Sequence, residues 1–283
     1  MKDTFFPKKK VLNVRGKIWI LDSPVVMGIL NLTSDSFYDG GKHYSLDIAI
    51  ENASKMYEQG AEIVDVGAFS SRPGAQLISE EEEWSKLKDV ISGIKKQHPD
   101  KFISIDTYRS SIAKKSLELG ADIINDISGG QMDKAILDIA ALYQAPYIGM
   151  HMKGTPETMS EMAHYTHLEY ELLDYFLELQ TKAAEVGLVD LMIDPGFGFA
   201  KTLTQNYSLL AQMDMLKVLN RVVVVGISRK SMIYKTLKGE AADALNGTTA
   251  LHMAALIKGA DILRVHDVKE ALESITLYNK MTN

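Results

Sequence analysis

From Pro24 onward the chain alternates between short apolar segments and longer helical ones, and this alternation constrains its fold more than any other feature. Each short segment is a near-continuous apolar run rich in β-branched residues, which is typical of parallel strands covered on both faces. We predict eight such strands, over residues 25–30, 63–66, 102–105, 123–125, 146–150, 191–193, 222–225 and 262–265. Between them lie segments with helical periodicity, for example 45–59, 79–97, 110–119, 165–186 and 242–258.

Strands that alternate with helices build an α/β fold, either as a closed (β/α)₈ TIM barrel or as an open doubly wound sheet. The count of eight favours the barrel. Neither a P-loop nor the glycine-rich fingerprint of dinucleotide-binding folds follows the first strand, which argues against the open sheet. Gly60, Gly120 and Gly259 each stand where a helix should end and a strand should begin at once, so three connections share one design.

We predict that residues 1–283 form a single barrel domain, with residues 1–23 as an N-terminal extension. Within the extension, segments 11–14 and 17–21 flank Arg15 and Gly16, a pattern that predicts a β-hairpin. We expect this hairpin to cover the N-terminal mouth of the barrel.

Composition excludes several classes of protein. The formal net charge of −6 predicts no general attraction to nucleic acid or to anionic membranes. The longest aliphatic run, residues 222–225, is too short to span a bilayer, and the start of the chain lacks an apolar stretch of signal-peptide length. The chain has no cysteine, which removes disulfides, thiolate metal sites and cysteine nucleophiles. We therefore expect a cytoplasmic protein that acts on small molecules.

Polar side chains follow the predicted strands directly, at the end where β/α barrels carry their active sites. The strand starts hold no comparable set. An acid in this position can instead cap the next helix, and we favour that interpretation for Asp126. The set comprises Asn31, Ser71, Arg72, Asp106, Asn125, Asp126, His151, Asp194, Ser228, Arg229, Lys230, Arg264 and His266.

This set combines carboxylates and amides with cations, and it contains neither a serine–histidine–acid arrangement nor a metal cage of histidines and acids. Carboxylates and amides at the base of a pocket suit a flat heterocycle with adjacent N–H donors. Arginine suits phosphate oxygens. The residues alone therefore predict a heterocycle that carries a phosphate-type leaving group, without naming it. Loops 33–44 and 68–78, which contain glycine, are expected to act as lids.

Eight motifs carry a resemblance to a known family. They span residues 27–41, 71–75, 104–107, 124–130, 151–156, 194–199, 226–231 and 264–268. In this order they resemble the motifs of the dihydropteroate synthase family, the folate-pathway enzymes blocked by sulfonamides. Many members read Glu-Ser-Thr-Arg-Pro in the second loop, whereas this chain reads Phe69-Ser70-Ser71-Arg72-Pro73. Ser71 keeps the hydroxyl but loses a methyl group, which affects lid packing and sulfonamide affinity rather than chemistry.

The resemblance implies a (β/α)₈ barrel, usually dimeric, that acts as a transferase. The family's enzymes join (7,8-dihydropterin-6-yl)methyl diphosphate to 4-aminobenzoate and release diphosphate and 7,8-dihydropteroate, with Mg²⁺. Diphosphate would leave first, from a methylene carbon that becomes cation-like.

Family roles carry over by position. The implied pterin-binding residues are Asp106, Asn125, Asp194, Phe199 and Lys230. The implied diphosphate-binding residues are Asn31, Arg72, Arg264 and His266, of which Asn31 would also contact Mg²⁺. Phe37, Ser71, Pro73 and Ser231 would surround 4-aminobenzoate. Asp106, Lys230, Arg264 and His266 are the expected catalytic residues.

Two other functions stay open. A pterin-binding methyltransferase that serves a corrinoid protein shares the barrel and the acid–amide floor, but it needs no diphosphate pocket. Asn31, Arg72, Arg264 and His266 therefore argue against it. A catalytically silent pterin-binding barrel would be expected to lose loop residues first, whereas Asn31, Arg72 and Lys230 are all present.

Overall fold

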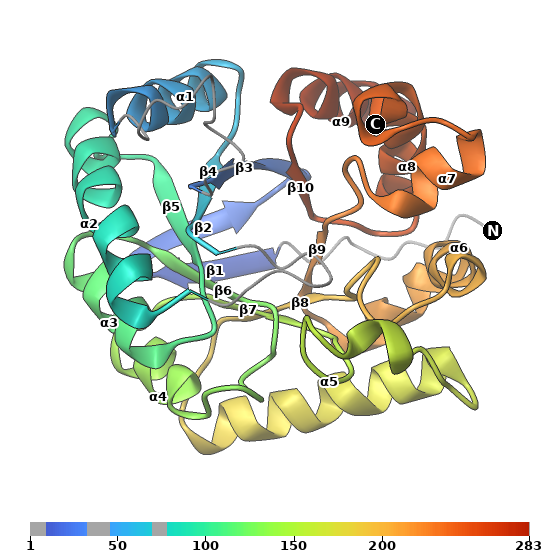
Figure 1. Cartoon of the computed structure of the whole chain (residues 1–283), viewed down its shortest axis with the longest axis horizontal. Coiled ribbons are helices and arrows are strands. Elements are labelled where there is room, and N and C mark those ends of the chain that lie inside the picture. The colour runs from blue at the N-terminus through green and yellow to red at the C-terminus, as the bar shows by residue number, and fades with distance from the viewer. Residues whose placement is uncertain (1–9, 33–45, 70–77, 283) are drawn as a thin grey trace.

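A closed barrel of eight parallel strands forms the centre of the molecule, with helices around it (Figure 1). The computed structural model describes residues 10–32, 46–69 and 78–282. The barrel strands follow one another in the order β10-β3-β4-β5-β6-β7-β8-β9. The predicted TIM barrel is thus confirmed, and the alternative of an open sheet is excluded. No described helix is long and apolar enough to cross a membrane.

The barrel strands are β3 (Val25–Asn31), β4 (Ile63–Gly67), β5 (Phe102–Asp106), β6 (Ile123–Asp126), β7 (Tyr147–Met150), β8 (Leu191–Asp194), β9 (Val222–Val225) and β10 (Ile262–Val265). The α-helices are α1 (Leu46–Glu58), α2 (Glu80–Gln97), α3 (Ser110–Glu118), α4 (Ala135–Leu142), α5 (Leu168–Glu185), α6 (Leu203–Gln212), α7 (Ser231–Leu237), α8 (Leu245–Ile257) and α9 (Val268–Thr282). Short 3₁₀ helices η2 (Met159–Glu161), η3 (Met213–Leu219) and η4 (Ala241–Ala244) complete the described elements.

The barrel interior changes chemistry along its axis. Side chains two residues apart on a strand point to the same face. Ile63, Ile123 and Met192 belong to one buried apolar cluster near the amino ends of the strands, which we call the lower end of the barrel. Two residues further along the same strands stand Asp65, Asn125 and Asp194, so a polar layer lies directly above an apolar one. The polar layer is at the carboxyl ends of the strands.

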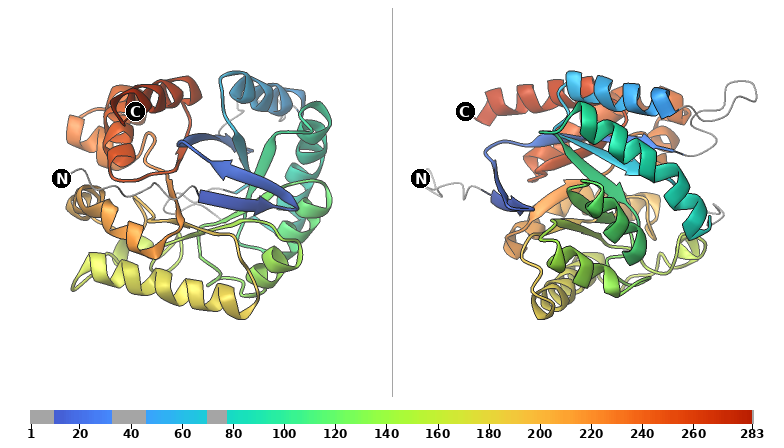
Figure 2. Two further views of the ribbon diagram at one scale, coloured as in Figure 1. Left: turned by 180° about the vertical axis from the view of Figure 1, so that it is seen from behind. Right: turned by 90° about the vertical axis from the view of Figure 1, so that its left-hand side faces the viewer.

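A two-stranded hairpin closes the lower end of the barrel, as predicted. β1 (Lys10–Val14) pairs antiparallel with β2 (Lys17–Leu21). The turn residues Arg15 and Gly16 both have positive φ, of 52° and 91°, which is the geometry of the turns that match strand twist. Apolar side chains of both strands join the lower barrel cluster. Seen from behind, the hairpin lies across this end of the barrel (Figure 2).

The repeated glycine ends three helices in the same way. Gly60, Gly120 and Gly259 have φ of 102°, 104° and 100°, a conformation that costs other residues free energy. The alanine after each glycine donates its N–H to a carbonyl five residues earlier, which is the Schellman pattern. Each chain reversal therefore leads from a helix straight into the next barrel strand.

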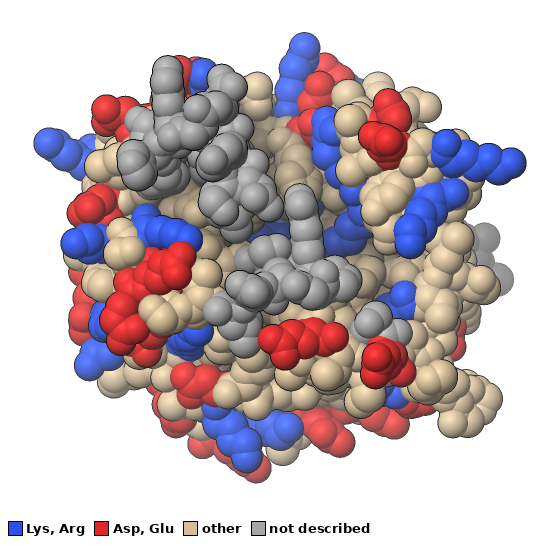
Figure 3. Space-filling view, in the orientation of Figure 1, with Lys and Arg blue, Asp and Glu red and all other residues tan. Residues whose placement is uncertain are grey.

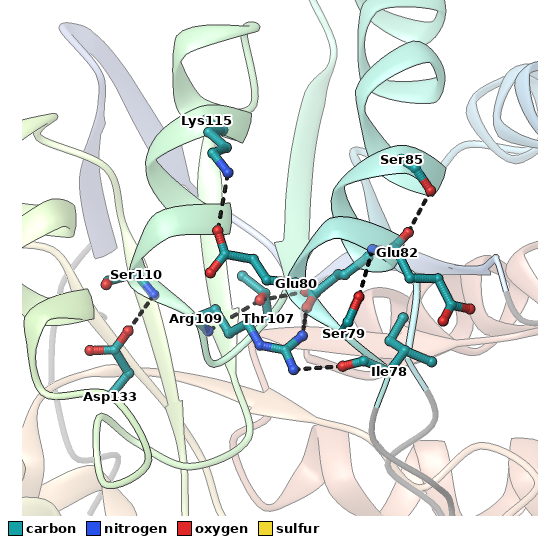
Figure 4. A network of polar contacts seen from close by, with 11 residues as sticks. Ile78, Ser79, Glu80, Glu82, Ser85, Thr107, Arg109, Ser110, Lys115 and Asp133 are labelled. Atoms are coloured by element: carbon teal, nitrogen blue, oxygen red, sulfur yellow. Dashed lines mark hydrogen bonds and ion pairs between the residues drawn. The ribbon is translucent and has the colours of Figure 1, made fainter.

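A buried polar network fixes the far end of the segment that follows β4 (Figure 4). Arg109, just before α3, forms an ion pair with Glu83 of α2 and donates from Nη2 to the carbonyl oxygen of Ile78 at 2.7 Å. Thr107 donates to the other carboxylate oxygen of Glu83 at 2.7 Å. The Ser79 side chain caps α2 by accepting from the Glu82 N–H. Ile78 is the first described residue after 70–77, so this network holds the chain directly before α2.

Replacing Arg109 with alanine is expected to lower the free energy of unfolding by about 3–5 kcal/mol, because it leaves the Glu83 carboxylate buried without a cation. Urea unfolding of the purified variant measures this. The matched control is Lys115→Ala, since Lys115 pairs with Glu80 at 3.0 Å but both side chains are about two-fifths exposed. That control should lose no more than about 1 kcal/mol. Equal losses in the two variants would contradict the assignment.

Candidate active site

Arg264 of β10 joins two buried acids at the centre of the polar layer. Its Nη2 lies 2.7 Å from Oδ2 of Asp106 and 2.7 Å from Oδ2 of Asp65, and Nε donates to the same Asp65 oxygen at 2.7 Å. Asn125 donates from Nδ2 to Asp65 Oδ2 at 2.9 Å. Four strands thus place their side chains in one hydrogen-bonded cluster. The carboxylates hold the pKa of Arg264 above its usual value in spite of its burial, so the guanidinium stays charged.

Both acids keep one oxygen without a donor. Oδ1 of Asp65 and Oδ1 of Asp106 are buried and have no hydrogen-bond partner within the described part of the chain. Burial raises the pKa of Asp106, and the charge of Arg264 opposes this rise. A buried acceptor without a partner costs about 1–3 kcal/mol. The site therefore favours a ligand that brings N–H donors to these oxygens.

Asp194 and Lys230 form a second acid–base pair beside the first cluster. Oδ1 of Asp194 accepts from the Gly196 N–H at 2.7 Å, which leaves Oδ2 directed elsewhere. A Cβ built on Gly226 would lie 3.7 Å from that Oδ2, 3.9 Å from Lys230 Nζ and 4.0 Å from Arg264 Cβ. Three side chains thus converge above Gly226, and any side chain at this position would fill the space between them.

Burial raises the pKa of Asp194, an effect that Lys230 opposes. Burial likewise lowers the pKa of Lys230 to about 8, with Asp194 acting against the change. The Lys230 ammonium donates to the carbonyl oxygen of Phe197 and lies 4.6 Å from the centre of the Phe199 ring. Phe199 is half-buried, so an aromatic face borders the cation at the wall of the site. In Figure 3, which views the carboxyl ends of the strands, blue Lys and Arg atoms are visible near the middle of this face.

His266 lies at the rim of the site and is exposed. Its Nδ1 is 3.0 Å from Oγ of Ser228, which also accepts from the His266 backbone N–H at 3.2 Å. Desolvation by surrounding protein atoms and the neighbouring Arg264 lower the pKa of His266. Because Nδ1 contacts Ser228, Nε2 is the ring nitrogen left for a ligand.

The remaining predicted residues divide into two groups. Asn31 ends β3 at the mouth and Ser231 begins α7 next to Lys230; both are half-buried. Phe37, Ser71, Arg72 and Pro73, together with the expected lids, lie wholly or largely outside the described residues, so their placement stays a prediction.

Several polar residues near the strand ends serve the scaffold instead. Asp126 points away from the site and accepts from the Ser128 and Gly130 N–H groups and from Tyr147 Oη, so it has a structural role in a turn. The helix cap that we favoured for it is wrong, because the next helix, α4, begins only at Ala135. Arg229 makes a two-point contact with Asp267, at 2.8 Å for each bond. The contacts of Asp126 and the Arg229–Asp267 pair therefore stabilise loops and do not face the pocket.

Asp65 is the member of the site that sequence reasoning missed. It lies inside a segment that we assigned to a strand solely because it is apolar. A charged residue within a strand buried on both faces is rare without a partner. That anomaly was the available signal. The partner is 199 residues away in the chain, so the pattern alone could not supply it.

The fold and the site together define a class, the barrel enzymes that bind a polar heterocycle at an acid–amide floor. The family described as pterin binding enzyme matches residues 27–266. The dihydropteroate synthase of Escherichia coli K12 is 42% identical over 257 residues, which covers 90% of either chain.

Solved structures agree with these comparisons. Dihydropteroate synthase of Xanthomonas albilineans with 4-aminobenzoic acid superimposes with a TM-score of 0.90 at 34% identity, covering 97% of this chain and 98% of the other. The Yersinia pestis dihydropteroate synthase in a sulfonamide drug complex gives a TM-score of 0.90 at 37% identity, covering 96% and 99%. The chain belongs to the pterin-binding enzyme family and, within it, to the dihydropteroate synthases.

Proposed function

We propose that this chain condenses (7,8-dihydropterin-6-yl)methyl diphosphate with 4-aminobenzoate to give 7,8-dihydropteroate and diphosphate. One observation carries the proposal: two buried carboxylate oxygens, on Asp65 and Asp106, face a polar cluster without donors of their own. A pterin offers several N–H donors on one flat ring, and each new hydrogen bond would recover the cost of a bare acceptor. Membership of the family supports the same substrate.

The pterin would occupy the upper end of the barrel. Asp106, Asn125 and Asp194 would accept from ring N–H groups. The two carboxylates would bind most strongly, because hydrogen bonds to ionised acceptors are about twice as strong as those to neutral ones. Lys230 would donate to an acceptor atom of the ring. Phe199, beside Lys230, would cover one face of the heterocycle. Asp106 Oδ1 would thereby gain the donor that it lacks in the protein alone.

The diphosphate would lie towards the rim, near Asn31, Arg264 and His266, with Arg72 joining from the second loop. Among the described residues no group of three or more His, Cys, Asp or Glu could hold a metal ion. Such a site fits Mg²⁺ that is held mainly by substrate phosphates and water, with Asn31 as one protein ligand. When bound, Mg²⁺ would supply charge neutralisation on the departing diphosphate.

The reaction begins when the bond between the methylene carbon and the diphosphate oxygen breaks. The Arg264 guanidinium and the His266 ring N–H would stabilise charge on the leaving oxygens. Burial raises the pKa of Asp106 and its contact with Arg264 opposes the rise. In its ionised form, Asp106 would stabilise the cation-like carbon that is conjugated with the pterin. The amine of 4-aminobenzoate, held by Phe37, Ser71, Pro73 and Ser231, then forms the carbon–nitrogen bond and loses a proton. No covalent bond to the enzyme is required.

The test is an assay of the purified protein with both substrates and Mg²⁺. We expect stoichiometric release of diphosphate and 7,8-dihydropteroate, each measured by chromatography. Chelation of Mg²⁺ by EDTA should abolish turnover, and added Mg²⁺ should restore it. Binding of the pterin without turnover would instead support the silent barrel. Transfer of a methyl group from methyltetrahydrofolate to a corrinoid protein would support the methyltransferase.

We propose in addition that the protein is a homodimer that buries the outer face of α8. The second half of this helix, residues 250–257, is apolar except for the buried His252. Leu251, Met253 and Ala254 are half-buried and Ile257 is exposed. Apolar surface that a single chain leaves in solvent is often covered by further protein. Light scattering should give twice the mass of one chain, and Ile257→Asp should lower it.

A further inference from the structure

Lys201, in the loop between β8 and α6, has an ammonium group that is enclosed by the protein. The residue is only 9% exposed. Its Nζ donates to the carbonyl oxygens of Gly196 at 2.9 Å and Phe199 at 3.1 Å, and lies 3.0 Å from Nδ1 of His151. An ammonium has three N–H donors, so these partners use all of them. No carboxylate bonds to Lys201 among the described residues.

Two of the three partners of Lys201, Gly196 and Phe199, belong to the 194–199 segment, which carries the proposed pterin contacts Asp194 and Phe199. The loop cannot hold its shape through regular backbone pairing, because Gly196, Gly198 and Ala200 all have positive φ, of 70°, 81° and 46°. A Cβ at Gly196 would lie 2.1 Å from the His151 carbonyl oxygen, so the loop presses against the end of β7. The carbonyl oxygens of Gly196, Phe197 and Phe199 accept from lysine side chains, and Gly196 also accepts from the Phe199 N–H at 3.1 Å.

Two lysines donate hydrogen bonds to carbonyl groups of this loop. Lys230 contacts the Phe197 carbonyl oxygen from the pocket. Lys201 contacts the carbonyl groups before and after it, and the contact with His151 ties the loop to the neighbouring strand β7. Lys230 is a proposed ligand contact, whereas Lys201 uses its three N–H donors on protein atoms. Its removal would let the wall move without removing any ligand contact.

His151 accepts this bond as a neutral ring. Burial, followed by the charges of Lys201 and Lys153, lowers the pKa of His151 to about 2. Burial lowers the pKa of Lys201 to about 7, and the charge of Asp194 opposes this change. The charged form of Lys201 can only donate, so with it Nδ1 is the acceptor and the ring proton is on Nε2. Tyr175 packs edge-on against the ring, with centroids 4.9 Å apart, and holds its plane.

We propose that Lys201, anchored on His151, is a positioning residue that holds the 194–199 loop in the shape that binds the pterin. This inference rests on the proposed function. It assigns to Lys201 no contact with the substrate. The ammonium also acts at a distance on Asp194: burial raises the pKa of Asp194, and the charges of Lys230, Arg264 and Lys201 oppose this rise.

Two effects should follow when Lys201 becomes methionine, which keeps the length of the side chain but has no donor. The pterin should bind about tenfold or more weakly, since the loss of one bond that orders the loop is worth about one factor of ten. The affinity of 4-aminobenzoate should stay within about twofold, because its proposed contacts lie on other loops. The pH below which pterin binding is lost should rise, because Asp194 loses a nearby positive charge and protonates more readily.

The experiment compares wild type, Lys201→Met, Lys201→Gln and the exposed control Lys182→Met. Calorimetry with 6-hydroxymethyl-7,8-dihydropterin measures affinity between pH 5 and 9, initial rates give KM for each substrate, and circular dichroism checks folding. Lys201→Gln keeps N–H donors without charge and should recover part of the pterin affinity. The pH below which it loses the pterin (the acid limb of the binding curve) should match that of Lys201→Met. The control should equal wild type. If Lys201→Met does not fold, Lys201→Gln still reports both the affinity and the acid limb.

The possible outcomes separate this inference from the proposed function. A wild-type protein that binds no pterin would reject the proposed function itself. If wild type binds and a folded Lys201 variant binds equally well with an unchanged acid limb, the positioning role is wrong. Equal increases in both KM values would also overturn it, because they indicate general loosening of the barrel.

Discussion

Replacing Asp194 with alanine is expected to abolish measurable binding of the pterin. The variant removes an acceptor from ring N–H groups and leaves the buried Lys230 ammonium without the acid that balances it. Hydrogen bonds to a charged group are worth about 1.5–3 kcal/mol each, so two of them correspond to a loss of about 3–6 kcal/mol, or roughly a hundredfold to ten-thousandfold. Calorimetric titration with 6-hydroxymethyl-7,8-dihydropterin measures the loss.

The matched control is Asp190→Ala, just before the other end of the same strand β8. Asp190 accepts from the Asn13 N–H of the hairpin at 3.1 Å, far from the proposed pocket. Its loss should cost stability of about 1 kcal/mol but leave the pterin affinity unchanged. An Asp194→Ala variant that folds and still binds the pterin like wild type would reject the assignment of Asp194.

Replacing Arg264 with alanine is expected to slow turnover and to destabilise the barrel at the same time. The loss of one preorganised donor to developing negative charge typically lowers kcat by about 10²–10³-fold. The variant also leaves Asp65 and Asp106 buried without their shared cation, at a cost of about 3–5 kcal/mol in the free energy of unfolding. Steady-state kinetics and urea unfolding measure the two effects separately.

Arg264→Lys separates charge from geometry. Lysine keeps a cation between the two acids, so most of the stability should return, but a single ammonium cannot reproduce the fork that spans Asp65, Asp106 and a phosphate. Turnover should therefore stay low while the protein is stable. Arg221→Ala, at the opposite end of neighbouring β9, should leave kcat unchanged. Wild-type kcat in a folded Arg264→Ala variant would refute the role of Arg264.

The strands were predictable because burial on both faces leaves a plain sequence signal. All eight predicted ranges match observed strands to within a residue at either end. The functional side chains were harder. Asp106, Asn125 and Asp194 lie at or next to the last residue of their strands and on the inner face, where the alternation of side chains predicts them. Asp126, one residue after Asn125, points outward for the same reason. It stabilises a turn instead of capping the next helix, because several residues separate it from α4.

Some predictions stay untested by the structure. They are the single-domain organisation, the cytoplasmic location, the dimer, Mg²⁺ and the substrate-binding and catalytic roles of the site residues.

The sequence by itself determined the (β/α)₈ order, the hairpin and the end of the barrel that carries the polar side chains, because each depends on local periodicity and on neighbours within a few residues. Only the tertiary structure decided how those side chains are paired. Asp65 meets Arg264 and Lys201 meets His151 across intervals of 199 and 50 residues. Such partners are selected by burial, since a charge removed from water must find a partner wherever the closed barrel brings one.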